Sequence, residues 1–412
     1  MPQSDAAAIQ IDPLSQEAVA DLPGFYKRLR SECPVYYYRD YDSFFFSRFE
    51  DVWELLRIGD NTFVATETNL PTPDYLRSHR NSGNPPPLAS TNPMSPGPSL
   101  PSPWYEEMRG AHNTPLKPKS VKRLADYIEE VVSRRLDQLL PLGRFDIVRD
   151  FAGYVVACSV CRLFGLPESK AESLLRLVNE TTRPAADATV DFAHFFNMLK
   201  GYIIPCVQER RAAGADGENA LIDGLVNYRM PDGRALSDEE IADQLVCVMI
   251  GGVESASKVT GQGLMELWKQ PEQLAAVRAN LEENVPIAVN EMVRVGAPAQ
   301  YTFRTAHKDV TVAGQPIRAG QRVVAMLASA ARDEREFDNP DEFIWDREIP
   351  RVISFGLGQH HCVGKHLALL EIKVMVRQFL ERVQDFAFDL DEAQRNPSYF
   401  QHGWIKLPVM VK

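Results

Sequence analysis

The sequence lacks any uninterrupted apolar segment long enough to cross a bilayer. A membrane-spanning helix needs roughly 18 consecutive apolar residues, and no stretch of the 412 residues reaches that length. The first 20 residues are polar and acidic and contain Pro2 and Pro13, which is not the pattern of a secretory signal. We therefore expect a protein with no membrane span and a cytoplasmic location.

Cysteine is scarce, and positive charge is in deficit. The six cysteines show no spacing typical of a disulfide framework, which favours a reducing compartment. The net charge of −11 argues against nucleic acid or an anionic membrane surface as a main partner. Cys158 and Cys161 form a C-x-x-C pair, but they lie in an apolar run with no second pair nearby. Packing within a helix is therefore the preferred interpretation of this pair.

One cysteine is placed differently, in the segment Phe355-Gly356-Leu357-Gly358-Gln359-His360-His361-Cys362-Val363-Gly364. Glycine permits positive φ and close approach of other groups, and residues 367–372 indicate a helix directly after the loop. The backbone N–H groups and dipole at a helix N-terminus favour a thiolate. Such a thiolate can act as a nucleophile, a redox thiol or a metal ligand, whereas a buried structural thiol is the ordinary alternative.

The spacing Phe-x-x-Gly-x-His-x-Cys-x-Gly resembles the haem-binding loop of the cytochrome P-450 family, the haem-thiolate monooxygenases. The match includes Phe355, Gly358, His360, Cys362 and Gly364. The resemblance implies that Cys362 is the axial ligand of the iron of haem b. It also implies that His360 lies by a haem propionate and that Phe355 packs against the ring beside the sulfur.

A second unusual segment interrupts a long apolar helix that we expect to begin after Ser237. Gly251 and Gly252 each cost about 1 kcal/mol relative to Ala in a helix interior. An acid that follows them in a buried helix is a second liability, and such combined exceptions indicate a functional site. The resemblance implies that Gly251 leaves room for O2 and that Glu254 and Ser255 are the acid–alcohol pair for proton delivery. Serine stands where threonine is usual, so the restricting methyl is lost.

Two arginines are expected at the haem propionates. Tyr105 and Arg109 are four residues apart and share a helical face. The resemblance implies that Arg109 binds a propionate and that Tyr105 replaces the usual His, because a phenol can still donate a hydrogen bond. Arg304, in a predicted strand, resembles the second propionate-binding Arg. The alternative for the first pair is an ordinary surface contact between neighbouring turns.

The family resemblance also sets the expected fold. We predict a mainly α protein with a smaller β region (α+β), one domain over residues 1–412, with residues 1–16 as a flexible N-terminus. Glu291, Arg294 and Arg347 resemble the buried ion network of the family. The ten prolines of residues 71–103 exclude a continuous helix and are expected to cover the substrate pocket.

Three segments carry specific structural predictions. Residues 17–32 predict an amphipathic helix, and the aromatic runs around 35–47 predict a β-hairpin. Residues 399–404 and 407–411 predict a second hairpin whose tip points into the pocket.

The function that the resemblance implies is insertion of one atom of O2 into a small apolar or aromatic substrate, by hydroxylation or oxidative demethylation. Electrons would pass from NAD(P)H through a reductase to a ferredoxin or flavodoxin. The expected docking surface is a set of basic residues, Lys117, Lys119, Lys122, Arg123 and Lys365.

Three alternatives remain open at this point. A peroxide-dependent peroxygenase would carry Arg-Pro in place of Glu254 and Ser255. A non-enzymatic haem or gas sensor needs no acid–alcohol pair. A cysteine hydrolase would use Cys362 with His360 or His361.

Overall fold

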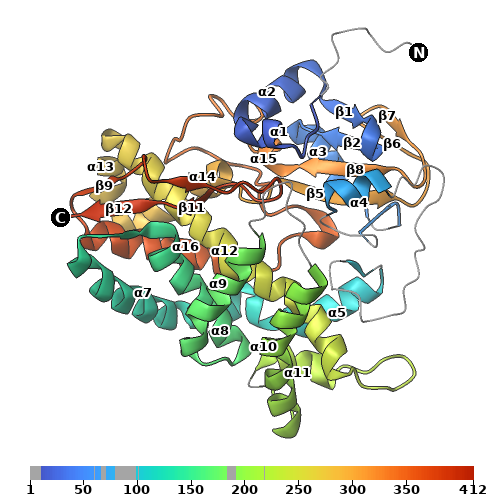
Figure 1. Cartoon of the computed structure of the whole chain (residues 1–412), viewed down its shortest axis with the longest axis horizontal. Helices are drawn as coiled ribbons and strands as arrows, with labels where there is room; N and C mark the ends of the chain where they lie inside the picture. Colours follow the sequence, from blue (N-terminus) through green and yellow to red (C-terminus); the bar gives the residue numbers. More distant parts are fainter. Residues whose placement is uncertain are drawn as a thin grey trace.

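The computed structural model describes residues 11–59, 61–65, 71–78, 99–100, 102–182, 192–217 and 219–412. Most of the described elements are helices, which lie around the long helix α12 (Asp238–Lys269), while the larger sheet lies to one side with α1 to α3 (Figure 1). The other α-helices are α1 (Gln16–Ala20), α2 (Leu22–Glu32), α3 (Phe49–Arg57), α4 (Pro73–Ser78), α5 (Trp104–His112), α6 (Pro118–Val121), α7 (Ala125–Leu139), α8 (Tyr154–Phe164), α9 (Ala171–Thr182), α10 (Phe192–Ala212), α11 (Ala220–Asn227), α13 (Pro271–Ala279), α14 (Leu281–Gly296), α15 (Leu327–Ala330) and α16 (Lys365–Arg382). None of the described helices is long and apolar enough to traverse a bilayer.

Short helical turns and strands complete the fold. The turns are η1 (Arg39–Tyr41), η3 (Thr114–Leu116), η4 (Lys122–Leu124), η5 (Leu140–Leu142), the π-helix η6 (Ile147–Gly153), η7 (Glu168–Lys170) and η8 (Gly358–His360). The strands are β1 (Val35–Tyr38), β2 (Ser43–Phe46), β3 (Phe63–Val64), β4 (Arg144–Asp146), β5 (Tyr301–Ala306), β6 (Val310–Val312), β7 (Gln315–Ile317), β8 (Arg322–Met326), β9 (Phe386–Phe388), β10 (Gln394–Arg395), β11 (Trp404–Lys406) and β12 (Pro408–Val411).

The start of α12 follows from its sequence. The Ser237 hydroxyl accepts from the Glu240 backbone N–H at 3.1 Å, and Glu240 Oε2 accepts from the Ser237 N–H at 2.7 Å. This reciprocal cap satisfies two backbone donors that the first turn leaves open. Further along, a Cβ on Gly252 would lie 2.7 Å from Val160 Cγ2, so the small residue lets α12 approach α8 closely. The predicted helix is therefore present, and it runs unbroken through both glycines.

The larger sheet has the order β1-β2-β8-β5-β3, and β2 pairs in parallel with β8. The predicted hairpin is present as β1 and β2, with Val35 opposite Phe46. The predicted helix over residues 17–32 is broken at Asp21 into α1 and α2. Asp21 Oδ1 accepts from the Gly24 N–H at 3.1 Å, so this residue caps a new helix instead of continuing the first one.

The predicted C-terminal hairpin is wrong. Strand β11 pairs with β10, whereas β12 pairs with β4 and β9 in a different sheet. Pro408 lies opposite Asp146, which is 262 residues earlier in the sequence. The loop between β10 and β11, residues 396–403, instead bridges to the start of β5, where Gln401 pairs with Ala299.

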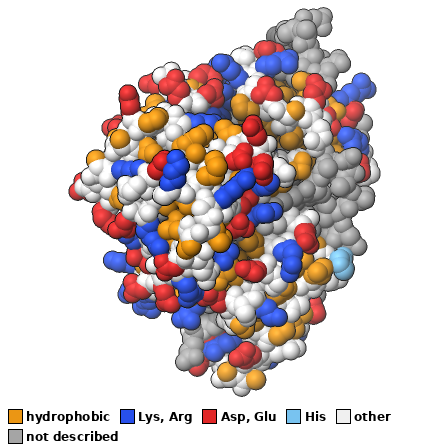
Figure 2. Space-filling model, turned by 60° about the vertical axis from the view of Figure 1, so that its left-hand side comes forward, with side chains coloured by type: hydrophobic (Ala, Val, Ile, Leu, Met, Phe, Trp, Pro, Cys, Tyr) orange, Lys and Arg blue, Asp and Glu red, His pale blue; other side chains and the backbone are white. Residues whose placement is uncertain are grey.

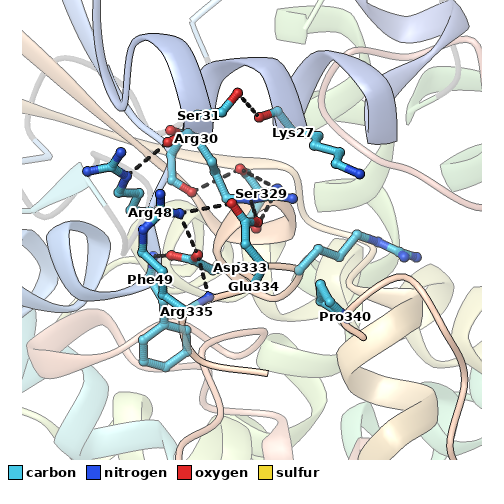
Figure 3. A network of polar contacts seen from close by, with 12 residues as sticks. Lys27, Arg30, Ser31, Arg48, Phe49, Ser329, Asp333, Glu334, Arg335 and Pro340 are labelled. Carbon is cyan, nitrogen blue, oxygen red and sulfur yellow. Dashed lines mark hydrogen bonds and ion pairs between the residues drawn. The ribbon is translucent and has the colours of Figure 1, made fainter. Parts of the chain in front are cut away.

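A buried polar network joins the N-terminal helices to the segment after α15 (Figure 3). Arg30 is buried, and its Nε lies 3.0 Å from Glu334 Oε2 while its Nη1 donates to the Ser329 carbonyl at 3.2 Å. The Phe49 backbone N–H donates to Asp333 Oδ2 at 2.7 Å, which caps the start of α3. These contacts fix the sheet region relative to the segment that leads to Cys362.

Two segments expected to be irregular are described only in part. Residues 1–10 and 79–98 lie outside the described residues. Within residues 11–16, Leu14 is buried and Asp12 Oδ2 lies 2.9 Å from Arg77 Nη2 of α4. The expected flexible N-terminus therefore does not extend over residues 11–16, because this stretch packs against the sheet region.

Candidate active site

The cysteine loop depends on two glycines with positive φ. Gly356 has φ of +67° and Gly358 has φ of +71°, and a Cβ on Gly358 would lie 2.4 Å from the Leu56 carbonyl oxygen. The Cys362 N–H donates to the Phe355 carbonyl at 2.9 Å, which closes the loop before α16 begins. Gly364 has a negative φ of −85° as the N-cap of α16, so it is not required for backbone conformation.

The groups around Cys362 shift the pKa of its thiol in opposite directions. Desolvation by the surrounding protein raises the pKa of the Cys362 thiol, and it outweighs the Gly364 N–H, the Arg109 charge and the contributions of Lys365. The predicted N–H groups are in place and lower the pKa of the thiol, as expected, but burial has the larger effect. A coordinated metal cation deprotonates a thiol directly, so a bound cation would overcome this effect of burial.

A cavity lies next to the cysteine loop. Cys362 is solvent-accessible, although surrounding protein atoms desolvate it, and the next residue in the chain, Val363, lines the cavity. The cavity is lined by residues of α5, α12 and the cysteine loop, namely Tyr105, Met108, Arg109, His112, Gln244, Cys247, Val248 and Val363.

One stripe of α12 faces the same region. Cys247, Val248, Gly251 and Ser255 are accessible, whereas Val246, Met249 and Val253 are buried. A Cβ on Gly251 would meet nothing within 4 Å, so the helix leaves room on this side. The spacing of four residues along the stripe is that of one helical face. The structure thus brings Gly251 and Ser255 onto the face that borders the cavity.

Helix α5 contacts the cysteine loop directly. Arg109 Nη2 donates to the His361 carbonyl at 2.6 Å, and Nη1 donates to the Tyr105 hydroxyl at 2.6 Å. The Tyr105 ring stacks on His360, with ring centroids 4.1 Å apart and an interplanar angle of 22°. The structure therefore brings Tyr105, Arg109 and His360 together at one edge of the cavity.

His112 is a cavity residue that the sequence analysis missed. It is buried, and its Nδ1 has no hydrogen-bond partner among the described residues. Burial, and secondly the Arg109 charge, lowers the pKa of His112 to about 4. The one sequence signal was its position three residues after Arg109, on the same face of α5.

A charged residue outside the predicted acid–alcohol pair contacts its acid. Glu254 is buried and its Oε1 lies 2.8 Å from Lys258 Nζ, which is also buried. Lys258 was not singled out in the sequence, although its i,i+4 spacing from Glu254 permits such a pair.

Arg304 lies on β5, where it donates to Thr302 Oγ1 at 2.9 Å and to the Phe303 carbonyl at 2.7 Å. These contacts lie within its own strand, so its propionate role stays a prediction.

The predicted buried ion network is present. Arg294 Nε and Nη2 donate to the two oxygens of Glu291 at 2.6 and 2.7 Å, and Arg347 Nε donates to Glu291 Oε1 at 3.1 Å. Arg294 also donates to the Ala331 and Pro340 carbonyls at 2.9 and 2.8 Å. The bidentate pair therefore fixes the segment before the cysteine loop against α14.

More than half of the chain matches the model of a known protein family. The model of the family described as cytochrome P-450 matches residues 188–410. The chain belongs to the cytochrome P-450 family. The predicted family and fold class are thereby confirmed, and the chain is a cytochrome P-450 monooxygenase.

Individual cytochromes P-450 match over much of the chain. Cytochrome P-450-terp of Pseudomonas sp is 30% identical over 305 residues, which cover 69% of each protein. The monooxygenase PikC of Streptomyces venezuelae is 28% identical over 410 residues, or 97% of this chain and 94% of PikC. A solved structure of a mutant of P-450 EryK with erythromycin B has a TM-score of 0.82, with 25% identity, and covers 97% of this chain and 98% of EryK.

The residues around the cavity fit the haem that the P-450 family implies. Cys362 is an accessible thiol beside backbone N–H groups that favour its thiolate, and His112 Nδ1 is a buried polar atom that lacks a partner among the described residues. Arg109 supplies a positive charge at the cavity edge for an anionic group. No cluster of three potential metal-ligating side chains occurs in the described part of the chain.

Proposed function

We propose that this cytochrome P-450 inserts one atom of O2 into a small apolar or aromatic substrate, by hydroxylation or oxidative demethylation, with Cys362 as the axial ligand of haem b. The observation that carries this proposal is a cavity that Val363, the neighbour of the accessible Cys362, shares with Cys247, which lies one turn before the open face of α12 at Gly251. When bound, the haem supplies the iron at which O2 is activated.

The side chains around the cavity have separate roles in this proposal. Tyr105, Arg109, His360 and Arg304 hold the haem carboxylates. Phe355 fixes the loop through its carbonyl, which accepts from the Cys362 N–H, while the Lys365 ammonium lies 5.7 Å from its ring centroid. Gly364 starts α16 and so orients the N–H groups beside the sulfur.

Helix α12 carries the residues that bind and move protons. The half-buried Ser255 hydroxyl orients water at the cavity, and Gly251 leaves the space that this water and O2 need. Glu254 moves protons between this region and more distant solvent, since a carboxylate can both accept and donate them.

We further propose that an acidic ferredoxin or flavodoxin, reduced by NAD(P)H through a reductase in the cytoplasm, docks on the basic surface of α6 and η4. Lys117, Lys119, Lys122 and Arg123 are exposed, and none forms an ion pair with a described residue. Residues 117–123 contain no acid. In contrast, Figure 2 shows a face on which basic and acidic side chains are intermixed. Since α6 packs against α16, this surface lies near the helix that follows Cys362.

The haem assignment is tested by spectroscopy and by turnover. The reduced protein with carbon monoxide is expected to show the red-shifted Soret band of thiolate ligation, and Cys362→Ser is expected to lose it. A retained band in Cys362→Ser would refute the ligand assignment. Product that requires O2, NAD(P)H and redox partners supports the monooxygenase, whereas equal product from peroxide alone indicates a peroxygenase. Haem binding without product under either condition indicates a sensor.

The docking surface is tested by charge reversal. Lys117→Glu with Lys122→Glu is expected to slow reduction by the partner and to flatten its dependence on salt, because steering by charged patches mainly sets the association rate. Lys308→Glu is the matched control, since Lys308 is exposed on the turn between β5 and β6. Equal reduction rates in the double variant and this control would move the docking site elsewhere.

A further inference from the structure

A buried ion pair lies on α12, one turn beyond the cavity stripe. The side chains of Glu254 and Lys258 are 1% and 0% exposed, and Glu254 Oε1 lies 2.8 Å from Lys258 Nζ. Buried charges are costly unless they are paired and hydrogen-bonded, and lysine is among the residues least often fully buried. The position of Lys258 therefore calls for a specific role beyond the filling of space.

A third group completes the surroundings of this ammonium. Lys258 Nζ donates to Gln401 Oε1, and Gln401 is itself buried. Gln401 belongs to the 396–403 loop, which is far from α12 in sequence. The ammonium thus lies between the Glu254 carboxylate and a side-chain amide from a separate part of the chain.

The 396–403 loop is shaped to fit Lys258. Gly403 has φ of +124°, and a Cβ at this position would lie 3.1 Å from Lys258 Cβ and 3.4 Å from its Cγ and Cδ. A larger residue would be strained in the backbone and crowded by the lysine stem. The turn therefore packs directly on the aliphatic part of Lys258.

The same loop is anchored to the body of the protein. The His402 N–H donates to the Pro298 carbonyl at 2.8 Å, and the Gln300 N–H donates to the Phe400 carbonyl at 2.9 Å. These bonds flank Gln401 on both sides, so its amide has a fixed place from which to hold the ammonium.

We propose that Lys258 is a positioning residue for the reaction: with Gln401 it holds the Glu254 carboxyl group in place beside Ser255. This assignment rests on the proposed function, in which Glu254 moves protons. An ammonium 2.8 Å from Oε1 restricts the direction in which the carboxyl group points. Lys258 acts through Glu254 and does not touch the reacting atoms.

The test is a double-mutant cycle with Lys258→Met, Glu254→Gln and the double variant. Turnover in H2O and D2O and hydrogen peroxide per consumed NAD(P)H are measured for each. We expect Lys258→Met to slow turnover about 10-fold and to raise the solvent isotope effect, a smaller loss than the roughly 10²–10⁴-fold that proton-transferring groups contribute. The double variant is expected to be no slower than Glu254→Gln alone, because Lys258 has no effect without the carboxylate.

The stability and spectra of the variants separate positioning from a merely structural role. The unfolding midpoint and the carbon monoxide spectrum show which variants fold and bind haem. If Lys258→Met does not fold, Gln401→Leu takes its place in the cycle, because it leaves the ion pair intact. We then expect a smaller change in the solvent isotope effect.

Two outcomes would overturn the assignment in distinguishable ways. The first applies when the parent enzyme is functional. The positioning role alone is then refuted if the turnover losses of the two single variants multiply in the double variant, or if Lys258→Met leaves the solvent isotope effect unchanged. A parent that binds haem but forms neither product nor peroxide refutes the proposed function and this assignment with it.

Discussion

Glu371 on α16 makes the stability of the protein depend on pH. Its side chain is buried, and Oε1 has no hydrogen-bond partner among the described residues. Burial raises the pKa of Glu371 to about 8, against the opposite effect of a hydrogen bond with Ser159. The native protein therefore holds a proton on this carboxyl group at neutral pH, whereas the unfolded chain releases it.

The sign and size of the effect follow from linkage. Between the unfolded pKa of 4.5 and the native pKa of about 8, the native state binds more protons, so stability falls as pH rises through this window. Each pH unit in the window lowers the free energy of unfolding by ~1.36 kcal/mol, so the total loss once the pH is above 8 is roughly 5 kcal/mol. Between about pH 5.5 and pH 7.5 the loss is about 2.5 kcal/mol.

Glu371→Gln removes this titration and keeps the shape of the side chain. We expect the variant to match the parent in free energy of unfolding near pH 5. Between about pH 5.5 and pH 7.5, the parent is expected to lose ~2.5 kcal/mol of stability that the variant keeps. The measurement is the urea midpoint of the ferric protein across this pH range, followed by far-UV circular dichroism. Glu381→Gln is the control, since Glu381 is exposed on the same helix. Stability curves of parent and Glu371→Gln that stay parallel would refute the buried, protonated carboxyl group.

Three further predictions concern the loop, the N-terminal network and the cavity. Gly358→Ala is expected to lower haem content and to cost about 1–3 kcal/mol in urea unfolding, because φ is positive and the Leu56 carbonyl is close. Gly110→Ala, at a helical position with open space around it, is expected to keep haem content and to stabilise the protein by up to about 1 kcal/mol; equal effects of the two substitutions would contradict this. Arg30→Met is expected to cost ~3 kcal/mol because it breaks a buried network, and a loss below about 1 kcal/mol would indicate that these contacts contribute little. Ser255→Ala is expected to keep haem and substrate spectra and to divert reducing equivalents from product to hydrogen peroxide; parent-like coupling would exclude this hydroxyl.

Local signals were sufficient to predict the main helix and much of the cysteine loop. Ser237 and Glu240 are three residues apart, so one turn of chain contains the whole cap. The positive φ of Gly358 is likewise required by the tight loop itself. The Glu291–Arg294 pair is also local in sequence, but its role in a buried network with Arg347 was predicted from the family resemblance.

Strand partners could not be predicted in the same way. The sequence of residues 399–404 and 407–411 favoured a hairpin, but β12 pairs with β4 and β9. Leu407 is buried, and its N–H donates to Asp146 Oδ2 at 3.2 Å, so the chain passes from one sheet to the other at this residue. The energy that decides such pairings comes from burial against distant segments, which alternation along a short strand does not encode.

The role of Lys258 could not be recognised from the charge pattern of α12. An acid and a lysine four residues apart usually form a solvated pair on an exposed helical face, which contributes little to stability. Here the same spacing is buried, because the Gly403 turn covers the lysine stem and Gln401 satisfies the ammonium. The chemical role of the pair is thus decided by a loop about 140 residues away in sequence. Because Lys258 connects α12 to this loop, a substitution in either element alters the position of the Glu254 carboxyl group. The double-mutant cycle measures this dependence as non-additive losses of turnover.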